Sequence, residues 1–254
     1  MAPMSLPIWA RITWRRVSPC RRPWCADSSG AALESSFGPH PLESKRVLVT
    51  AGPTFEPIDT VRGITNLSSG KMGYAVARAA VEAGAQVTLV SGPTALAAPG
   101  QVERIDVLTG RQMYEAVMAR VQAADIFIAV AAVADYHVVN QADHKLKRDA
   151  GPPQIELAEN PDILAAVAAR PRAPFCVGFA AETENLREYA QAKRRKKKIP
   201  LLAANIAQEA FGRDDNALTL FDDNGEHTIA RAPKEHVARA LIAHIAALMA
   251  HGAS

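Results

Sequence analysis

The sequence predicts an α/β fold built on a Rossmann-like, doubly wound and mostly parallel sheet. From Lys45 onward, short apolar runs alternate with amphipathic stretches of helical period, separated by loops rich in Gly, Pro, Asn and Asp. The run Asp125–Val133 is continuously apolar, which is typical of a strand covered on both faces. Strands that alternate with helices in this way form parallel sheets with right-handed crossovers.

Each element follows from its local pattern. Short apolar runs predict strands at 46–50, 86–91, 102–107, 125–133, 175–179 and 201–205. Helical spacing predicts helices at 74–83, 110–123, 162–169, 185–198 and 234–251, the first of them ended by Gly84. A late hairpin is expected from 217–221 and 227–230, with Asn224-Gly225 at its turn.

Composition narrows the class of protein. The chain has 254 residues, of which 48% are hydrophobic and 22% charged, and its net charge is +3. These values fit a soluble globular protein, and the charge is too mild to make nucleic acid the main partner. No run of 18 or more apolar residues occurs, so no membrane span is expected. The three cysteines form no zinc or disulfide pattern, which favours the reducing cytoplasm.

The stretch Met1–Ser44 differs from residues 45–254, which we expect to form the functional domain. It holds all three tryptophans, is rich in Arg, Pro and Ser, and has no acidic residue before Asp27. Its composition is similar to that of a transit peptide, but it lacks a clear apolar segment and a small-residue cleavage site. We therefore expect a disordered tail, or the remnant of a linker or of a lost upstream domain.

A polar loop rich in small residues follows the first expected strand and precedes the first helix. It includes Thr50–Thr54 and Arg62–Gly73, with glycines at Gly52, Gly70 and Gly73. Small residues let a ligand approach the backbone, and free N–H groups at a helix start bind anions. The loop predicts a phosphate site at the carboxyl edge of the sheet, although a tight turn would show the same glycines. Its spacing is neither G-x-G-x-x-G nor a P-loop.

Further candidate residues lie where other expected strands end or the next helix begins. Ala131–Tyr136 ends an apolar strand in small residues and a carboxylate, so Asp135 could orient a ligand, help hold a metal or cap a turn. Phe179 could stack on a base or be buried, and Asn205 could read a base or cap a turn. The segment Asn160–Ile163 starts a helix by ordinary capping logic.

Two basic segments could each serve either binding or structure. Lys145–Arg148 alternates around a Leu, and the residues alone favour a solvated edge strand over a binding face. Lys193–Lys198 ends a helix, where cations complement the helix dipole. Lys193 and Lys197 share a face at i, i+4, where an anion such as a triphosphate would relieve their repulsion.

The chain shows no readable nucleophile or metal-ligand motif. Ser-His-Asp, Cys-His, H-E-x-x-H and C-x-x-C arrangements are absent from the sequence, and the seven histidines are scattered along it. An enzyme of this sequence would therefore work by placing substrates and neutralising charge, and no protein ligands to a metal are predicted.

Together these segments make the chain similar to the phosphopantothenate–cysteine ligase (phosphopantothenoylcysteine synthetase) family of coenzyme A biosynthesis. The resemblance covers about Lys45 to the C-terminus, and its carriers are VLVTAGPTFEPIDTVRGITNLSSGKMG, AAVADY, KLKR, ENPDI, VGFAAET and the KRRKKK helix. It implies that cysteine is joined to 4'-phosphopantothenate through an acyl-nucleotidylate, with CTP as in bacterial relatives or ATP as in some eukaryotic ones. It also implies Mg²⁺ on the triphosphate, and a small β element beside the sheet for dimerisation or as a flap.

The resemblance also implies residue roles. Asn66 would hold the activated carboxyl group and Lys145 would stabilise charge at the α-phosphate, so these two are the expected catalytic residues. Arg62 would bind phosphopantothenate from the second subunit of a homodimer with shared sites, and the segment Lys145–Gly151 would be a mobile flap. The remaining substrate-side residues would be Asn66, Ala131, Ala132 and Asp135. The nucleotide would contact Gly52, Ser68, Gly70, Gly73, Val130, Ala131, Asp135, Lys145, Asn160, Pro161, Asp162, Ile163, Phe179, Lys193, Lys197 and Asn205.

Two departures from the family pattern stand out. Arg148 occupies the last position of the basic flap motif, where lysine is expected, and the two cations differ in hydration and geometry. The flavin-dependent decarboxylase half that usually precedes this domain in bacteria is not readable in Met1–Ser44, so neither FMN nor decarboxylation is expected.

Three alternative hypotheses compete with the ligase. A nicotinamide-dependent reductase would use the same kind of sheet, but the dinucleotide fingerprint is absent and no acidic residue ends the second strand. A nucleic-acid-binding module would use Lys193–Lys198, but this is one cluster without interleaved aromatics. A truncated gene product with an intact fold is the third.

Overall fold

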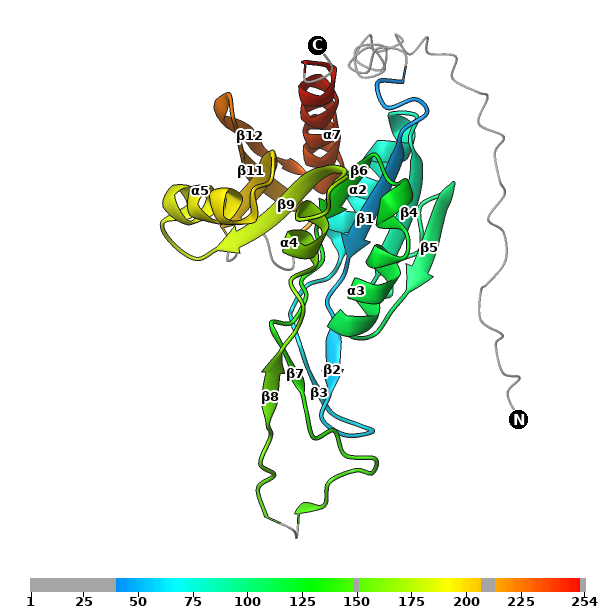
Figure 1. Ribbon diagram of the computed structural model, residues 1–254, viewed down its shortest axis with the longest axis vertical. Helices are drawn as coiled ribbons and strands as arrows, with labels where there is room; N and C mark the ends of the chain where they lie inside the picture. The colour runs from blue at the N-terminus through cyan, green and yellow to red at the C-terminus, as the bar shows by residue number, and fades with distance from the viewer. Residues whose placement is uncertain (1–39, 149–150, 207–212, 252–254) are drawn as a thin grey trace, which may run out of the picture. The chain divides into compact units, whose positions relative to one another are not determined.

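The central sheet of the protein has eight strands. The computed structural model describes residues 40–148, 151–206 and 213–251. The strands of the sheet are β1 (Arg46–Ala51), β4 (Gln86–Ser91), β5 (Val102–Asp106), β6 (Ile126–Ala129), β9 (Phe175–Glu182), β10 (Leu201–Ile206), β11 (Asp215–Asp222) and β12 (Gly225–Pro233). Their spatial order is β12-β11-β10-β9-β6-β1-β4-β5 (Figure 1).

The sheet has the order expected of a doubly wound fold. The strands from β10 to β5 pair in parallel, whereas β11 and β12 are antiparallel additions at one edge. Counted along the chain, the parallel strands lie in the order 3-2-1-4-5-6, which is the Rossmann order. The predicted fold class is therefore confirmed. The reversal of direction in this order lies between β1 and β6, so a crevice is expected where those two strands end.

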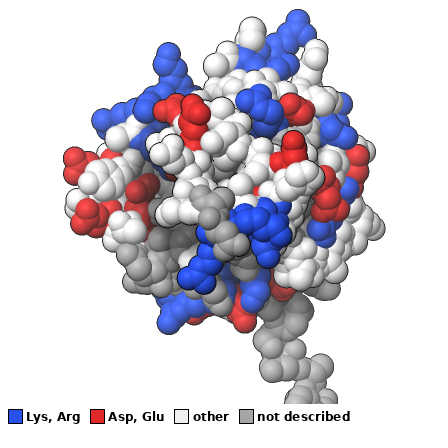
Figure 2. Space-filling view, turned by 90° about the horizontal axis from the view of Figure 1, so that it is seen from below, with Lys and Arg blue, Asp and Glu red and all other residues white. Residues whose placement is uncertain are grey.

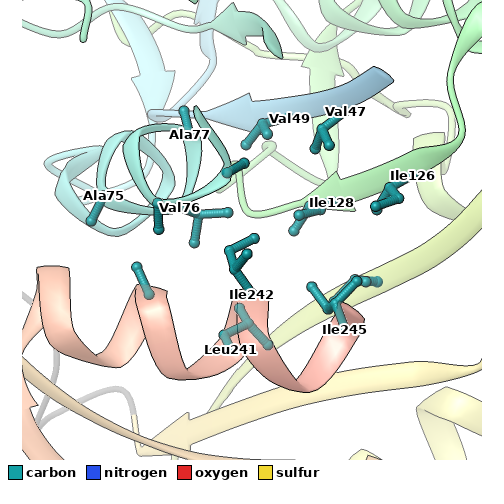
Figure 3. Close-up of a cluster of buried hydrophobic side chains, with 14 of the residues drawn as sticks. Val47, Val49, Ala75, Val76, Ala77, Ile126, Ile128, Leu241, Ile242 and Ile245 are labelled. Carbon is teal, nitrogen blue, oxygen red and sulfur yellow. The ribbon is translucent and has the colours of Figure 1, made fainter. Parts of the chain in front are cut away.

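Helices cover both faces of the sheet. They are α2 (Lys71–Glu82), α3 (Gly110–Met118), the short 3₁₀ helix η1 (Val121–Ala123), α4 (Ile163–Ala168), α5 (Leu186–Lys197) and α7 (Lys234–His251). One core lies between the sheet and α2 with α7, and a second lies under α3, α4 and α5. Figure 3 shows Val49 and Ile128 of the sheet facing Val76 of α2 and Ile242 of α7. These apolar layers hold the strand ends at fixed positions.

Several predicted boundaries are wrong, and each error has a local reason. The strand predicted at 125–133 ends at Ala129, because regular pairing with β1 stops there and Ala132 hydrogen-bonds with the loop after β1. The helix predicted at 110–123 ends at Met118, although the 3₁₀ turn keeps Val121 buried on the same side. Helix α2 begins at Lys71, before its predicted start at 74. The hairpin turns at Asp223-Asn224, one residue earlier than predicted.

Two short antiparallel ribbons extend from the carboxyl end of the sheet (Figure 1). One pairs β2 (Phe55–Pro57) with β3 (Gly63–Thr65), and the other pairs β7 (Tyr136–Val138) with β8 (Leu157–Glu159). The backbone N–H of Ala142 donates to the Ile58 carbonyl at 3.0 Å, which joins the two ribbons. We call the four strands and their connecting loops, 55–65 and 136–159, the extension; it corresponds to the small β element that was expected.

The described chain begins at His40, before the expected domain boundary at Lys45. Leu42 is 1% exposed, and its N–H donates to the Ala83 carbonyl at 2.9 Å, so this residue belongs to the core and not to a tail. The remainder of the predicted tail, residues 1–39, lies outside the described residues. No helix in the described ranges combines the length and apolar character that crossing a membrane requires.

Candidate functional site

A cavity of about 520 Å³ lies where β1 and β6 end, at the reversal point of the strand order. Eleven predicted site residues are among the described residues that line it: Gly52, Asn66, Ser68, Gly70, Gly73, Val130, Ala131, Ala132, Phe179, Lys193 and Asn205. They come from the loops after β1 and β6, the start of α2, the ends of β9 and β10, and α5. The fold thus brings together segments that are far apart in the sequence.

The floor of the cavity is made by two backbone segments that hydrogen-bond with each other. The N–H of Ala132 donates to the Gly52 carbonyl at 2.9 Å, and the N–H of Thr54 donates to the Ala132 carbonyl at 3.2 Å. The buried Thr54 hydroxyl accepts from the N–H of Ala134 at 2.9 Å. Because Ala131 and Ala132 have small side chains, this floor leaves room for a ligand against the backbone.

Asn66 joins the floor from the loop that precedes α2. Its side-chain amide donates to the Ala132 carbonyl at 2.9 Å, which fixes the amide plane at the cavity wall. The residue itself is exposed. Thr65, one residue earlier, is held in place because its hydroxyl donates to the Thr54 carbonyl at 2.7 Å. An exposed amide with a fixed orientation is suited to hydrogen-bond a carboxyl or acyl group of a ligand.

The start of α2 is shaped by three glycines. Gly70 precedes the helix with φ 77°, and Gly52 has φ 76°, both in the left-handed region that favours glycine. A Cβ on Gly73 would lie 2.5 Å from the Cβ of Ala51, so only glycine lets the first turn of α2 pack so closely on the end of β1. The first intrahelical bond runs from Tyr74 to the Gly70 carbonyl. The N–H groups of the first turn therefore remain available to an anion in the cavity.

Three lysines line the cavity and make it electropositive. Lys193 comes from α5, Lys71 begins α2, and Lys234 begins α7. Lys71 donates to Asp214 at 2.5 Å, and this hydrogen bond lowers the pKa of the Asp214 carboxyl. Burial, and then the nearby Lys71 charge, lowers the pKa of Lys234, whose ammonium group donates to the Arg213 carbonyl. No Asp or Glu is among the described lining residues, so an anionic ligand meets no carboxylate there.

The far wall of the cavity carries an aromatic ring and two amides. Phe179 of β9 is partly buried, and Asn205 of β10 donates to the side-chain carbonyl of Asn216 at 3.1 Å. Asn216 also accepts from the N–H of Ala217 at 3.0 Å. This wall therefore offers a flat apolar surface beside an amide pair, which suits a nucleobase or ribose.

The expected residues Arg62 and Lys145 lie in the extension, outside the described lining of the cavity. Arg62 contacts Asp59 at 2.5 Å and also donates to the Leu146 carbonyl at 3.0 Å. The fully buried Asp59 side chain in turn accepts from the N–H of Leu146 at 3.1 Å. The hydrogen bond from Arg62 is the main reason that the pKa of Asp59 is well below its usual range. Asp59 and Arg62 thus clamp the backbone beside the exposed Lys145.

The basic motif Lys145–Arg148 is not the edge strand that its residues favoured. It is irregular, and its Leu146 is held by the Asp59–Arg62 clamp. Of the expected flap Lys145–Gly151, residues 149–150 lie outside the described residues.

The basic helix α5 is paired with a carboxylate at the start of α4. Lys197 contacts both carboxylate oxygens of Asp162, at 2.7 and 2.6 Å. Burial opposes ionisation of Asp162, but the hydrogen bonds from Lys197 and the N–H of Ala165, together with the charges of Lys197 and Lys193, outweigh burial and lower the pKa of this carboxyl. Asp162 thus provides an anion beside Lys197, which lies outside the described lining of the cavity, whereas Lys193 belongs to that lining. Asp162 also caps α4, accepting from the N–H of Ala165 at 3.0 Å.

The other residues of the 160–163 segment, with Asp135, lie beside the cavity and not in its described lining. Asn160 bridges to the carbonyls of Ala134 and Asp135, through its side chain at 2.9 Å and its backbone N–H at 2.8 Å. Its side-chain carbonyl oxygen is buried, without a hydrogen-bond partner in the described ranges. Asp135 is exposed, Pro161 is half-buried and Ile163 is in the core. Through these two bonds, Asn160 stabilises the segment that follows the floor.

Sequence reasoning missed nine described lining residues. Seven of them lie inside the motifs already singled out, beside residues that were given a role, so those motifs carried the signal. Asn216 and Lys234 carried no such signal, because only the antiparallel return of β11 and the position of α7 bring them to the cavity. The missed residues are Leu67, Ser69, Lys71, Met72, Val133, Ala180, Ala181, Asn216 and Lys234.

The geometry suits a phosphorylated, nucleotide-sized ligand whose reaction is assisted when the site neutralises its negative charge. The α2 start and three lysines offer anion contacts, the Phe179 wall suits a base, and Asn66 lines the same cavity. Within the described lining there is no nucleophile paired with a base. The chemistry that fits is therefore transfer at an activated phosphate or acyl group held in place by the site.

Comparison with known proteins places these features in context. Residues 42–249 match the family described as the DNA/pantothenate metabolism flavoprotein C-terminal domain. The Coenzyme A biosynthesis bifunctional protein CoaBC of Vibrio vulnificus (strain YJ016) is 48% identical over 227 residues, covering 87% of this chain. The chain spans only 57% of the length of that relative.

Two solved structures share the fold. The crystal structure of the C-terminal domain of a Coenzyme A biosynthesis bifunctional protein CoaBC is 39% identical, with a TM-score of 0.72, and covers 84% of this chain and 99% of that chain. A Cab2 mutant in complex with phosphopantothenate-cysteine has a TM-score of 0.68, and the match covers 89% of this chain and 93% of that one. At 16% identity, this second likeness concerns the fold alone.

Proposed function

The chain belongs to the DNA/pantothenate metabolism flavoprotein C-terminal domain family, and from this premise we propose that it ligates cysteine to 4'-phosphopantothenate. The observation that carries the proposal is the cavity at the β1/β6 reversal point, which is lined by Asn66, the start of α2 and the wall that holds Phe179. The product would be 4'-phosphopantothenoylcysteine, formed for coenzyme A biosynthesis.

Two steps account for the reaction. In the first, a carboxylate oxygen of 4'-phosphopantothenate attacks the α-phosphorus of CTP; the bond to the β-phosphate breaks and pyrophosphate leaves. In the second, the amine of cysteine attacks the acyl carbon; the acyl–oxygen bond breaks, CMP leaves, and the amine loses a proton. Neither step requires a covalent bond to the protein, which agrees with a site that lacks a paired nucleophile. No flavin takes part in either step.

Each group of lining residues would have one role in these two steps. Lys71, Lys193 and the N–H groups at the start of α2 would hold the phosphates, and Phe179 with Asn205 would contact the base or ribose. The amide of Asn66 would orient the activated carboxyl group toward the amine. Its hydrogen bond to Ala132 supports this role, because a fixed donor loses no orientational freedom when charge develops.

Mg²⁺ would enter with the nucleotide. The described lining of the cavity presents lysines and amides but no carboxylate, so the donor set fits an ion already held by phosphate oxygens and water. Bound there, the ion would neutralise charge on the triphosphate. The lysines and the helix start would then neutralise what remains.

A homodimer would complete the site. Lys145 and Arg62 lie in the extension and outside the described lining, and the extension exposes Val61, Tyr136, Val139 and Leu157. A second subunit that covers these apolar side chains would bring extension residues to a neighbouring cavity. Arg62 could then reach the phosphopantothenate of the partner, while Lys145 would reach the α-phosphate.

Nucleic acid and membranes are not among the proposed partners, and the proposed compartment is the cytoplasm. Figure 2 shows Lys and Arg side chains interspersed with Asp and Glu on the face it presents, with no continuous basic surface there. The cation Arg194 of the basic helix pairs with Asp223, and Lys197 pairs with Asp162.

Burial raises the pKa of the free Cys176 thiol to about 12, which makes this thiol unreactive.

The proposal is tested by pyrophosphate release from the purified full chain with Mg²⁺, 4'-phosphopantothenate and cysteine, in parallel reactions with CTP, ATP and no nucleotide. We expect release with CTP that depends on phosphopantothenate, and product formation that depends on cysteine as well. Absence of release with either nucleotide, from a chain shown by circular dichroism to be folded, would refute the proposed activity. Release with ATP alone would refute only the assignment of CTP.

A further inference from the structure

A cluster of two histidines and an aspartate lies among residues with no place in the proposed ligase chemistry. The Nε2 atom of His244 lies 2.7 Å from an oxygen of Asp222, and the Nε2 atom of His227 lies 3.2 Å from the same oxygen. One ligand atom from each residue can be chosen so that all three lie within 4.8 Å of one another. The two imidazole rings are 4.7 Å apart, centre to centre.

The fold, not the sequence spacing, brings these residues together. Asp222 ends β11 and has the same parity as Leu218 and Leu220, which face α7 in the core. His227 lies directly opposite Leu220 in the β11–β12 register, so it shares this face. His244 lies three residues after Leu241, on the side of α7 that packs against the sheet. Three elements therefore contribute one donor each (Figure 1).

The carboxylate of the cluster is ionised and committed to the two rings. Asp222 has only 2% of its side chain exposed. Burial opposes its ionisation, but hydrogen bonds from His244, the N–H of Asn224 and His227 outweigh burial and lower its pKa. The neighbouring acidic residues have other partners, since Asp223 pairs with Arg194 and Glu226 with Arg187. Asp222 is thus the anion that faces both imidazoles.

We propose that Asp222, His227 and His244 bind a divalent transition-metal cation of the Zn²⁺ type. Two imidazole nitrogens and one carboxylate oxygen are a common donor set for such ions, which bind these atoms at about 2.0–2.2 Å. Small side-chain rotations would replace the present N–H···O contacts with N–metal and O–metal bonds.

The expected consequence is structural. The ion would tie α7 to the β11–β12 hairpin, because its three ligands come from those three elements. The His227 side chain is 41% exposed, so the ion can enter from that side and water can complete the coordination. The same elements carry Asn216 and Lys234 to the ligase cavity, but the metal ligands do not line it. The inference therefore stands whether or not the ligase proposal does.

The test uses the full chain after removal of metal with EDTA. Zn²⁺ binding is measured by titration calorimetry and Co²⁺ binding by visible absorption, for the wild type, His244→Gln, His227→Gln and Asp222→Asn. His236→Gln is the matched control, because His236 is exposed on the same helix as His244. We expect one saturable equivalent in the wild type and the control, and more than about tenfold weaker binding in the other three variants. Zn²⁺ should also raise the melting temperature of the wild type but not of His227→Gln.

Two results would overturn the site: no saturable binding of either ion to the wild type, or equal binding by the wild type and both His227→Gln and His244→Gln. Loss of binding in His236→Gln would do the same, because it would assign the ion to a different place. His227→Gln decides the question if a change at the buried Asp222 prevents folding, since His227 is partly exposed at the hairpin surface. Circular dichroism of each metal-free variant checks the fold.

Discussion

The floor of the cavity and the extension are held by different kinds of interaction. The floor is joined by backbone hydrogen bonds between the loops after β1 and β6, above two apolar cores. The extension holds its basic motif through one buried carboxylate, Asp59, and one cation, Arg62. The first arrangement has no ionising group, whereas the second depends on a charge.

This difference indicates which step of the proposed reaction each region would affect. Asn66, Ala132 and the start of α2 line one cavity of a single chain, which is the pocket proposed for the nucleotide. Lys145 and Arg62 belong to the extension and are absent from the described lining of that cavity. We therefore expect changes at the floor to affect the whole reaction or its second step, and changes at the clamp to affect the first step.

The largest effect should come from Asn66→Ala. Removing a fixed donor at the reacting group should lower kcat about 10²–10³-fold, the range seen for single donors of this kind. The acyl-nucleotidylate should still form and accumulate, which quenched-flow analysis with labelled CTP would detect. Gln86→Ala is the control, because Gln86 is an exposed amide side chain at the opposite end of a parallel strand. Normal turnover by Asn66→Ala would remove this residue from the mechanism.

A smaller effect should follow from Gly73→Ala. The added Cβ would lie 2.5 Å from the Cβ of Ala51, so α2 must move away from β1. Overpacking of this kind costs about 1–3 kcal/mol of folding stability. Displacement of the anion-binding turn should weaken CTP binding by up to about 10²-fold. Calorimetric titration with CTP measures this, with Gly100→Ala as control, because a Cβ at Gly100 meets nothing within 4 Å.

At the clamp, Asp59→Asn should slow the first step by about tenfold, through loss of a charge-assisted hydrogen bond that positions the segment of Lys145. Hydrolysis or aminolysis of an acyl-nucleotidylate supplied from outside should be unchanged, because that step uses the floor. Asp143→Asn, at an exposed neighbouring position, is the matched control. If Asp59→Asn slowed both steps equally, the clamp would be a general stabiliser and not a positioning device.

The smallest effect should be the response to acid. The pKa of Asp59 is lower in the folded protein than in the unfolded chain. Its stabilising contribution is therefore complete above the unfolded value of about 3.9 and is lost as the pH falls through the lower folded value. The amide signal of Leu146 should keep its neutral-pH position down to about pH 3.9 and shift in NMR spectra only as the pH falls further toward the folded value of Asp59. It should shift before the signal of Ala132, because the floor contains no titrating group. Simultaneous changes at both amides would contradict the contrast between the two regions.

Much of the fold was predictable because its signals are local. The alternation of strands and helices, the Gly52 and Gly70 turns and the caps of the helices each depend on a few neighbouring residues. The end of β6 was not predictable in this way. Val130–Val133 are apolar enough to continue a strand, but Val130 and Ala131 hydrogen-bond to Thr50 near the end of β1, and Ala132 bonds with the loop after β1. A hydrogen-bond partner so distant in the sequence cannot be predicted from the local pattern.

The candidate site shows the same distinction between local and long-range signals. Sequence motifs indicated Asn66, Gly73, Phe179 and Lys193, which lie in the cavity lining, but they also indicated Lys197, whose charge Asp162 satisfies. A motif reports which residue types occur together, not which partner each one meets. Partners depend on contacts between distant segments, so charge pairs are the part of a site that sequence predicts least well.

Local backbone preferences and periodicity were enough to predict the α/β class, the position of the Gly-rich loop and the small residues that leave room for a ligand. Three other features depend on how the whole chain folds: the clamp of Asp59 on Leu146, the place of Lys234 at the cavity, and the meeting of Asp222, His227 and His244. Each of these joins segments whose distance in space is set by strand order and register. Strand order and register are fixed by burial of the whole core and not by any one segment.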